Sequence, residues 1–132
     1  MHAFLVDLEN KPGAFAMVAE AIAAQGVNIT SVSGVTCGGA GRTAMVTSDD
    51  VLTRTALGEA KCTYTEMEII EAALRDEPGA LAKATRRLAD AGVNIEALLP
   101  IRLEGNEAHV GFVTSDPVRT REVLTGAGMA AR

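Results

Sequence analysis

The chain has 132 residues, with 12 basic and 17 acidic side chains, a formal net charge of −5, two cysteines and no tryptophan. This length predicts one compact domain or two very small ones, with enough buried surface to fold without disulfides or metal ions. The negative charge and an aromatic share of 3% argue against nucleic-acid binding, because a basic footprint and a stacking platform are both missing. We also expect no signal peptide and no membrane association, since no basic leader or long apolar span occurs.

The first half of the chain predicts six elements. Phe4, Val6 and Leu8 alternate as in a half-buried strand, and Pro12 suits the first turn of the helix that follows. Asp49 is a good N-cap for a second helix. In chain order the expected elements are a strand over 4–8, a helix between Pro12 and Gly26, strands over 27–35 and 43–47, a helix between Asp49 and Gly58, and a strand over 61–66.

The second half repeats the first. PGAFA over 12–16 returns as PGALA over 78–82, and GVNI over 26–29 returns over 92–95, each 66 residues later. Nine of the eighteen positions from 12 to 29 equal their counterparts, where composition alone gives about one or two. We therefore predict two domains, 1–66 and 67–132. The second set of elements is a strand over 70–74, a helix between Pro78 and Gly92, strands over 93–103 and 107–114, a helix between Asp116 and Gly126, and a short final stretch over 129–132.

This order of elements, βαββαβ in each copy, predicts the α+β fold class. A strand–helix–strand unit with a right-handed crossover, used twice, gives a four-stranded antiparallel sheet with two helices on one face. The chain is therefore expected to form two ferredoxin-like βαββαβ units in tandem. Their open sheet faces and edges favour pairing between the copies or between two chains.

The turn before the first helix of each copy is a candidate anion site. Backbone N–H groups at Gly13 and Ala14, together with the helix dipole, favour a carboxylate, and glycine lets a ligand approach the backbone. Asn10 and Asn28 offer amide donors and acceptors, which suit a zwitterion. The competing interpretation is structural, because Pro-Gly is common at helix starts and asparagine often satisfies turn backbone.

The remaining chemistry-bearing residues predict no active site. Cys37 and Cys62 lack metal or redox spacing, so we expect free thiols in a reducing cytoplasm, with no metal and no cofactor. His2 and His109 are isolated in the sequence, and each is interpreted as a surface or packed histidine. No set of nucleophile, base and orienting residue can be assembled, so we expect no enzyme activity.

The spacing of the repeated motifs resembles that of the ACT domain, the small-molecule regulatory module of amino-acid metabolic enzymes. It is Asn-x-Pro-Gly over 10–13 followed by Gly-Val-Asn-Ile over 26–29. The resemblance covers both copies, and it implies the βαββαβ fold, side-by-side pairing of domains, and an amino acid or similar carboxylate metabolite bound at the domain interface near the Pro-Gly turn. The ligand contacts that it implies are Asn10, Pro12, Gly13, Ala14, Asn28, Ile29, Asp76, Gly79, Ala80 and Asn94.

Two departures from the family pattern favour the first copy as the site. Serine-sensing members have histidine two residues before the first asparagine, where this chain has Leu8, so a ligand other than serine is favoured. The second copy has Asp76 in place of that asparagine, and its charge repels a carboxylate.

Three functions follow as alternatives. The first is a sensor that binds an amino acid and regulates a metabolic enzyme, another regulator or its own assembly as a homodimer. The second is a ligand-free oligomerisation or docking module of the same fold. The third is an acylphosphatase-like enzyme, which shares the topology but needs an arginine in the first loop, where the cation here is Lys11.

Overall fold

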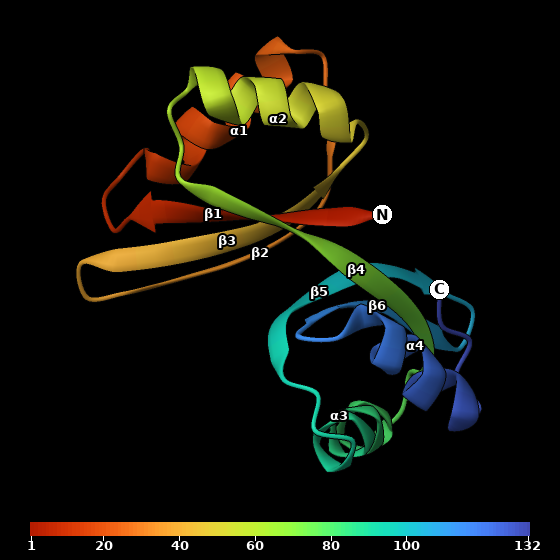
Figure 1. The fold of residues 1–132 in the computed structure, drawn as a ribbon. Coiled ribbons are helices and arrows are strands. Elements are labelled where there is room, and N and C mark those ends of the chain that lie inside the picture. Colours follow the sequence, from red (N-terminus) through yellow and green to blue (C-terminus); the bar gives the residue numbers. More distant parts are fainter. The chain divides into compact units, whose positions relative to one another are not determined.

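The computed structural model describes all 132 residues and contains four helices and six strands (Figure 1). The chain divides into two compact units, a first unit of His2–Met67 and a second unit of Glu68–Arg132 with Met1. In chain order the elements are β1 His2–Glu9, α1 Ala14–Ala24, β2 Ile29–Cys37, β3 Ala40–Thr47, α2 Asp50–Glu59, β4 Tyr64–Arg75, α3 Ala80–Asp90, β5 Ile95–Glu104, β6 Glu107–Thr114 and α4 Pro117–Gly126.

The first unit has the strand order β2-β3-β1-β4, with α1 and α2 on one face of its sheet (Figure 1). β1 and β2 each pair antiparallel with β3. The alternating residues Phe4 and Val6 face the helices and join Val18 and Ile22 of α1 in the buried core. The period-2 pattern of β1 therefore fixes which face of the sheet receives the helices.

The second unit has the order β5-β6-β4, and the chain end takes the fourth position. The N–H of Ala73 donates to the Ala130 carbonyl at 2.9 Å, and the N–H of Arg132 donates to the Glu71 carbonyl at 2.9 Å. The short stretch expected after Gly128 therefore pairs with β4, as the last strand of a βαββαβ unit should. The core again joins sheet and helices, through Leu74, Leu88, Phe112 and Leu124 among others.

The expected α+β order is confirmed, and so are the helix caps. The Asp49 carboxylate accepts from the N–H of Leu52 at 2.9 Å, and the Asp116 carboxylate accepts from the N–H of Arg119 at 2.9 Å. Each such cap stabilises a helix by about 1 kcal/mol.

Two expectations about strand boundaries were wrong. The strands expected over 61–66 and 70–74 are one strand, β4, because no glycine, proline or asparagine interrupts 64–75. The turn expected over 38–41 is shorter, since β2 extends through Cys37 and β3 begins at Ala40.

Candidate functional site

A cavity of about 570 Å³ opens in the first unit beside the turn between β1 and α1. Its wall includes Pro12, Gly13 and Ala14, three residues expected to contact a ligand. The end of β1 supplies Glu9 to the wall, and the segment after α2 supplies Lys61. One unit thus brings the predicted turn together with charged side chains from distant parts of the sequence.

The helix at this turn starts without a side-chain cap. Gly13 is the N-cap of α1 and has a left-handed backbone, φ 86°, whereas the other helix of this unit is capped by a carboxylate. The N–H of Ala14 is not free as expected, because it donates to the Lys11 carbonyl at 3.3 Å. The N–H groups of Phe15 and Ala16 have no acceptor in the chain, as is usual for the first turn of a helix. The positive end of α1 is therefore available to an anion.

Most charges around the cavity are already paired. Lys11 Nζ lies 2.7 Å from Glu9 Oε2, and this hydrogen bond and its charge lower the pKa of Glu9 and raise the pKa of Lys11. Arg42 Nε lies 2.9 Å from Asp7 Oδ1. Lys61 differs, since no carboxylate lies within ion-pair distance of its ammonium group. The cavity therefore holds one cation with no internal counter-ion.

Lys61 also has an unusual backbone. Its φ is 56°, and it is the one residue other than glycine with a positive φ. The N–H groups of Lys61 and Cys62 donate to the carbonyls of Gly58 and Leu57, which is the Schellman arrangement that ends a helix. The other three helices end in the same way with Gly26, Gly92 and Gly128 at this position. A lysine there costs about 1–2 kcal/mol relative to a relaxed backbone, so the fold alone would favour glycine.

The corresponding region of the second unit is acidic. A cavity of about 390 Å³ is lined by Asp76, Glu77 and Glu107, with Arg75 as its one cation. Gly79 and Ala80 are not part of its wall, although Gly79 has the same left-handed backbone as Gly13. Because Glu77 stands where the first unit has Lys11, the two turns share a conformation and differ in charge.

The asparagines expected to bind a ligand have structural partners. The Asn10 amide donates to the Gly38 carbonyl at 2.7 Å, which joins the turn to the β2–β3 hairpin. Asn28 and Asn94 stand at the far end of α1 and α3, about 16 Å from each Pro-Gly turn for an 11-residue helix. Their N–H groups donate to Ser48 Oγ and Ser115 Oγ at 2.9 and 3.0 Å. Within one unit, neither Asn28 nor the adjacent Ile29 is brought to the Pro-Gly turn.

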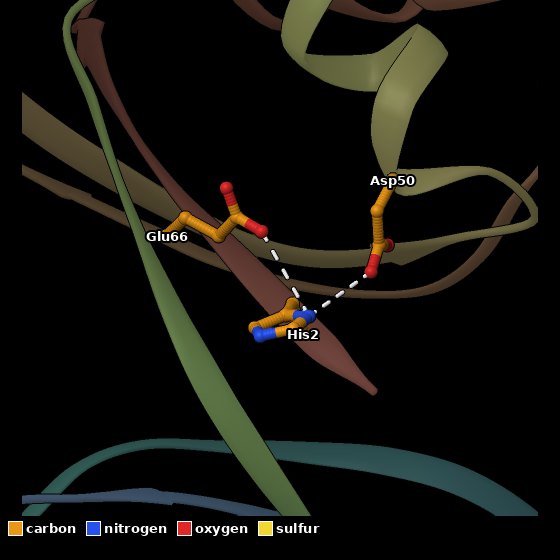
Figure 2. A group of neighbouring side chains, drawn as sticks. All are labelled: His2, Asp50 and Glu66. Carbon is orange, nitrogen blue, oxygen red and sulfur yellow. Dashed lines mark hydrogen bonds and ion pairs between the residues drawn. The ribbon is translucent and has the colours of Figure 1, made fainter.

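His2 forms a second cluster in the first unit. Figure 2 shows it between Asp50 and Glu66, with Nδ1 at 3.1 Å from Asp50 Oδ2 and 3.8 Å from Glu66 Oε1. The three ligand atoms lie within 4.8 Å of one another, a spacing that a divalent ion accepts. Arg54, however, donates to both Glu66 oxygens at 2.7 and 2.6 Å, which lowers the pKa of Glu66. This guanidinium and the positive end of α2 both oppose a cation, so the cluster acts as an ion-pair network that joins β1, α2 and β4.

Both histidines therefore differ from their interpretation as isolated residues. His2 lies beside carboxylates from α2 and β4, and Nδ1 of His109 lies 3.0 Å from Glu71 Oε1. These partners are 38 to 64 residues away in the sequence, and local spacing carries no signal for them. Lys61 was also missed, although its alignment with Gly128 at an offset of 67 residues would have marked it.

Solved structures share the fold of the whole chain. No protein-family model and no curated protein matches it. Protein BT0572 from Bacteroides thetaiotaomicron is similar with a TM-score of 0.83 and 24% identity, over 99% of this chain and 90% of that one. The ligand-free regulatory subunit of aspartate kinase from Thermus thermophilus has a TM-score of 0.68 and 18% identity, over 96% of this chain and 91% of that one. The chain has the tandem ACT fold.

The same tandem ACT fold also occurs within a larger protein. The aspartate kinase of Clostridium acetobutylicum is similar with a TM-score of 0.64 and 14% identity, over 96% of this chain but 32% of that kinase. None of the four helices of this tandem ACT chain is long and apolar enough to cross a membrane.

Proposed function

We propose that the first unit binds a free amino acid in the cavity beside Gly13. The observation that carries the proposal is Lys61, a cation with no internal counter-ion in a cavity next to an uncapped helix start. The ligand carboxylate accepts from the first N–H groups of α1 and from Lys61, and its ammonium group meets the carboxylates of Asp7 and Glu9. Each of these carboxylates keeps lone pairs beyond its present ion pair.

The wall of the cavity also favours a particular side chain on the ligand. Leu8, Met17 and Val18 line it together with Pro12. Apolar surface of this kind stabilises an aliphatic side chain by about 25 cal/mol per Å² that it buries. After the costs of ordering, two or three charge-assisted hydrogen bonds support dissociation constants of about 1 mM to 1 μM. That range suits a sensor of a metabolite.

The proposed role is regulatory and not catalytic. The thiol that lines the cavity belongs to Cys62, and burial raises its pKa, which disfavours the nucleophilic thiolate. The fold is shared with a regulatory subunit of aspartate kinase, which supports a chain that acts on an enzyme partner or on its own assembly, including a homodimer. We place this role in the cytoplasm, in line with the two free thiols.

Calorimetric titration with the twenty amino acids tests the proposal. An amino acid that binds should lose affinity by about tenfold or more both as its amide, which lacks the carboxylate charge, and as its deaminated acid, which lacks the ammonium group. Each compound serves as a control for the other, because the aliphatic side chain stays constant. No binding by any amino acid at about 1 mM, or equal binding of an amino acid and its amide, would overturn the proposal.

The second unit favours a different role. Its acidic cavity, with Asp76, Glu77 and Glu107, repels a carboxylate. We propose that this copy serves docking or assembly, with amino-acid binding confined to the first unit. Titration should then show one bound amino acid per chain, and two would contradict this assignment.

A further inference from the structure

The β5–β6 hairpin of the second unit places like charges opposite each other. The antiparallel register sets Glu104 opposite Glu107 across a two-residue turn, and Arg102 opposite His109 on the same face. Directly opposed carboxylates destabilise a hairpin, and their Cβ atoms lie about 4.5–5.5 Å apart. The first unit shows that the fold does not require this arrangement, because Cys37 and Ala40 are the corresponding pair there.

His109 adds a buried acceptor to these two carboxylates. Its Nδ1 lies 3.0 Å from Glu71 Oε1, and a carboxylate only accepts, so this nitrogen carries the proton of the neutral ring. Nε2 is then an acceptor, and it is buried without a hydrogen-bond partner. It lies 3.5 Å from Glu104 Oε2 and 3.8 Å from Glu107 Oε2. Three electron-pair donors thus converge with no proton or cation between them.

Glu71 supports the ring from behind as carboxylates do in metal sites. It is 3% exposed and accepts a short hydrogen bond from Arg102, with Arg132 Nε at 3.9 Å from its other oxygen. A carboxylate that accepts from the free N–H of a histidine fixes its tautomer and raises the basicity of the other nitrogen. Arg102 also donates to Glu104 at 3.2 Å, which orients that carboxylate.

We propose that His109 Nε2, Glu104 and Glu107 bind a divalent ion of the zinc class. Two ligands about 2.1 Å from a common ion at a tetrahedral angle lie about 3.4 Å apart, close to the 3.5 and 3.8 Å found here. The glutamate side chains are 67% and 54% exposed and free to close this small difference. A cavity of about 730 Å³, lined by all three ligands and Glu71, leaves room for water in the remaining positions. The ion removes both the carboxylate repulsion and the unpartnered nitrogen.

The His2 cluster is the natural control within the same chain. It also contains a histidine and two carboxylates, and Figure 2 shows Glu66 pointing toward His2. It has no carboxylate behind its imidazole, and Arg54 holds both oxygens of Glu66. A specific ion should therefore bind at His109 and leave His2 unaffected.

Titration of the full, tag-free and chelator-treated chain with Zn²⁺ and Co²⁺ tests the site. We expect one Zn²⁺ per chain, a rise in melting temperature on binding, and visible absorption bands of low-symmetry Co²⁺. The double variant Glu104→Gln and Glu107→Gln should weaken Zn²⁺ binding by about 100-fold, and Glu71→Gln by about 10- to 100-fold without removing a ligand. The paired control, His2→Gln with Asp50→Asn, should bind Zn²⁺ as the parent does.

Three results would overturn the proposal. One is a folded parent chain that does not bind Zn²⁺ at about 1 mM, which would mean that a second ring proton fills the position. Another is a double variant that binds as tightly as the parent, and the third is loss of binding in the His2 control. Circular dichroism and melting of each apo variant show that it is folded, and substitutions at the exposed glutamates are expected to change stability by about 0.5 kcal/mol or less.

Discussion

Substitution of Gly13 by alanine, with Gly79→Ala as its matched control, separates the binding site from the fold. Both glycines are the N-caps of their helices, with φ of 86° and 90°. A Cβ added at either position meets no atom within 4 Å. The cost is therefore backbone strain of about 1–2 kcal/mol, offset by about 0.4–1 kcal/mol from a less flexible unfolded chain. Each variant should lose about 1 kcal/mol, or roughly 4 °C in melting temperature.

The two variants should differ only when ligand is added. Gly13 lines the cavity of the first unit, whereas Gly79 lies outside the corresponding wall. At about 100 times its dissociation constant a ligand stabilises the folded chain by about 2.7 kcal/mol. The parent and Gly79→Ala should show this gain in urea unfolding. In Gly13→Ala the new methyl group blocks close approach to the backbone, and we expect about tenfold weaker binding, which removes about 1.4 kcal/mol of the gain.

The reasoning fails if Gly13→Ala and Gly79→Ala gain equally from the ligand. The turn of the first unit would then not contact it. An equal loss of the gain in both variants would also refute it, since the effect would follow from general destabilisation.

Three further predictions concern other residues at or near the site. Iodoacetamide should modify Cys62 more slowly than the exposed Cys37, because burial raises the pKa of Cys62, and bound ligand should protect Cys62 alone in peptide mass spectrometry. Lys61→Gly should preserve or raise stability by up to about 1 kcal/mol and weaken ligand binding about tenfold; destabilisation would assign the lysine to the fold. Glu66→Gln should cost about 0.5–1 kcal/mol at pH 7. Because Arg54 lowers the pKa of Glu66 below 4.5, this difference should persist above that value and vanish in urea unfolding as pH falls through the lowered pKa.

The fold was predictable because the repeat supplied each signal twice. Asp49 and Asp116 both cap a helix, and each cap is formed in the structure. Buried hydroxyl pairs, Thr47 with Thr53 and Thr114 with Thr120, recur at 2.7 Å in each unit. The boundary between 61–66 and 70–74 was not predictable from the repeat, since the end of one copy and the start of the next share a single strand.

The candidate site was only partly predictable. The Pro12-Gly13 turn carries its own conformational signal, whereas the amide of Asn10 was assigned to a ligand and instead bonds to the backbone of Gly38. Lys61 is recognisable only when its backbone conformation is known. The group at His109 depends on strand register, which brings Glu71 of β4 beside it across 38 residues. Pairwise contacts of this range are set by topology and not by local sequence.

The positions at which the two copies differ locate their functions. The caps and hydroxyl pairs that hold each unit are the same in both, so folding places no different demand on the two copies. The charged positions differ at aligned sites: Lys11 against Glu77, Lys61 against Gly128, Leu5 against Glu71, and Arg42 against His109. In each of these pairs one copy shows that the fold accepts another residue, and the residue in the other copy needs a separate reason. A carboxylate ligand in the first unit and a divalent cation in the second supply reasons of opposite charge, which is why neither cavity can substitute for the other.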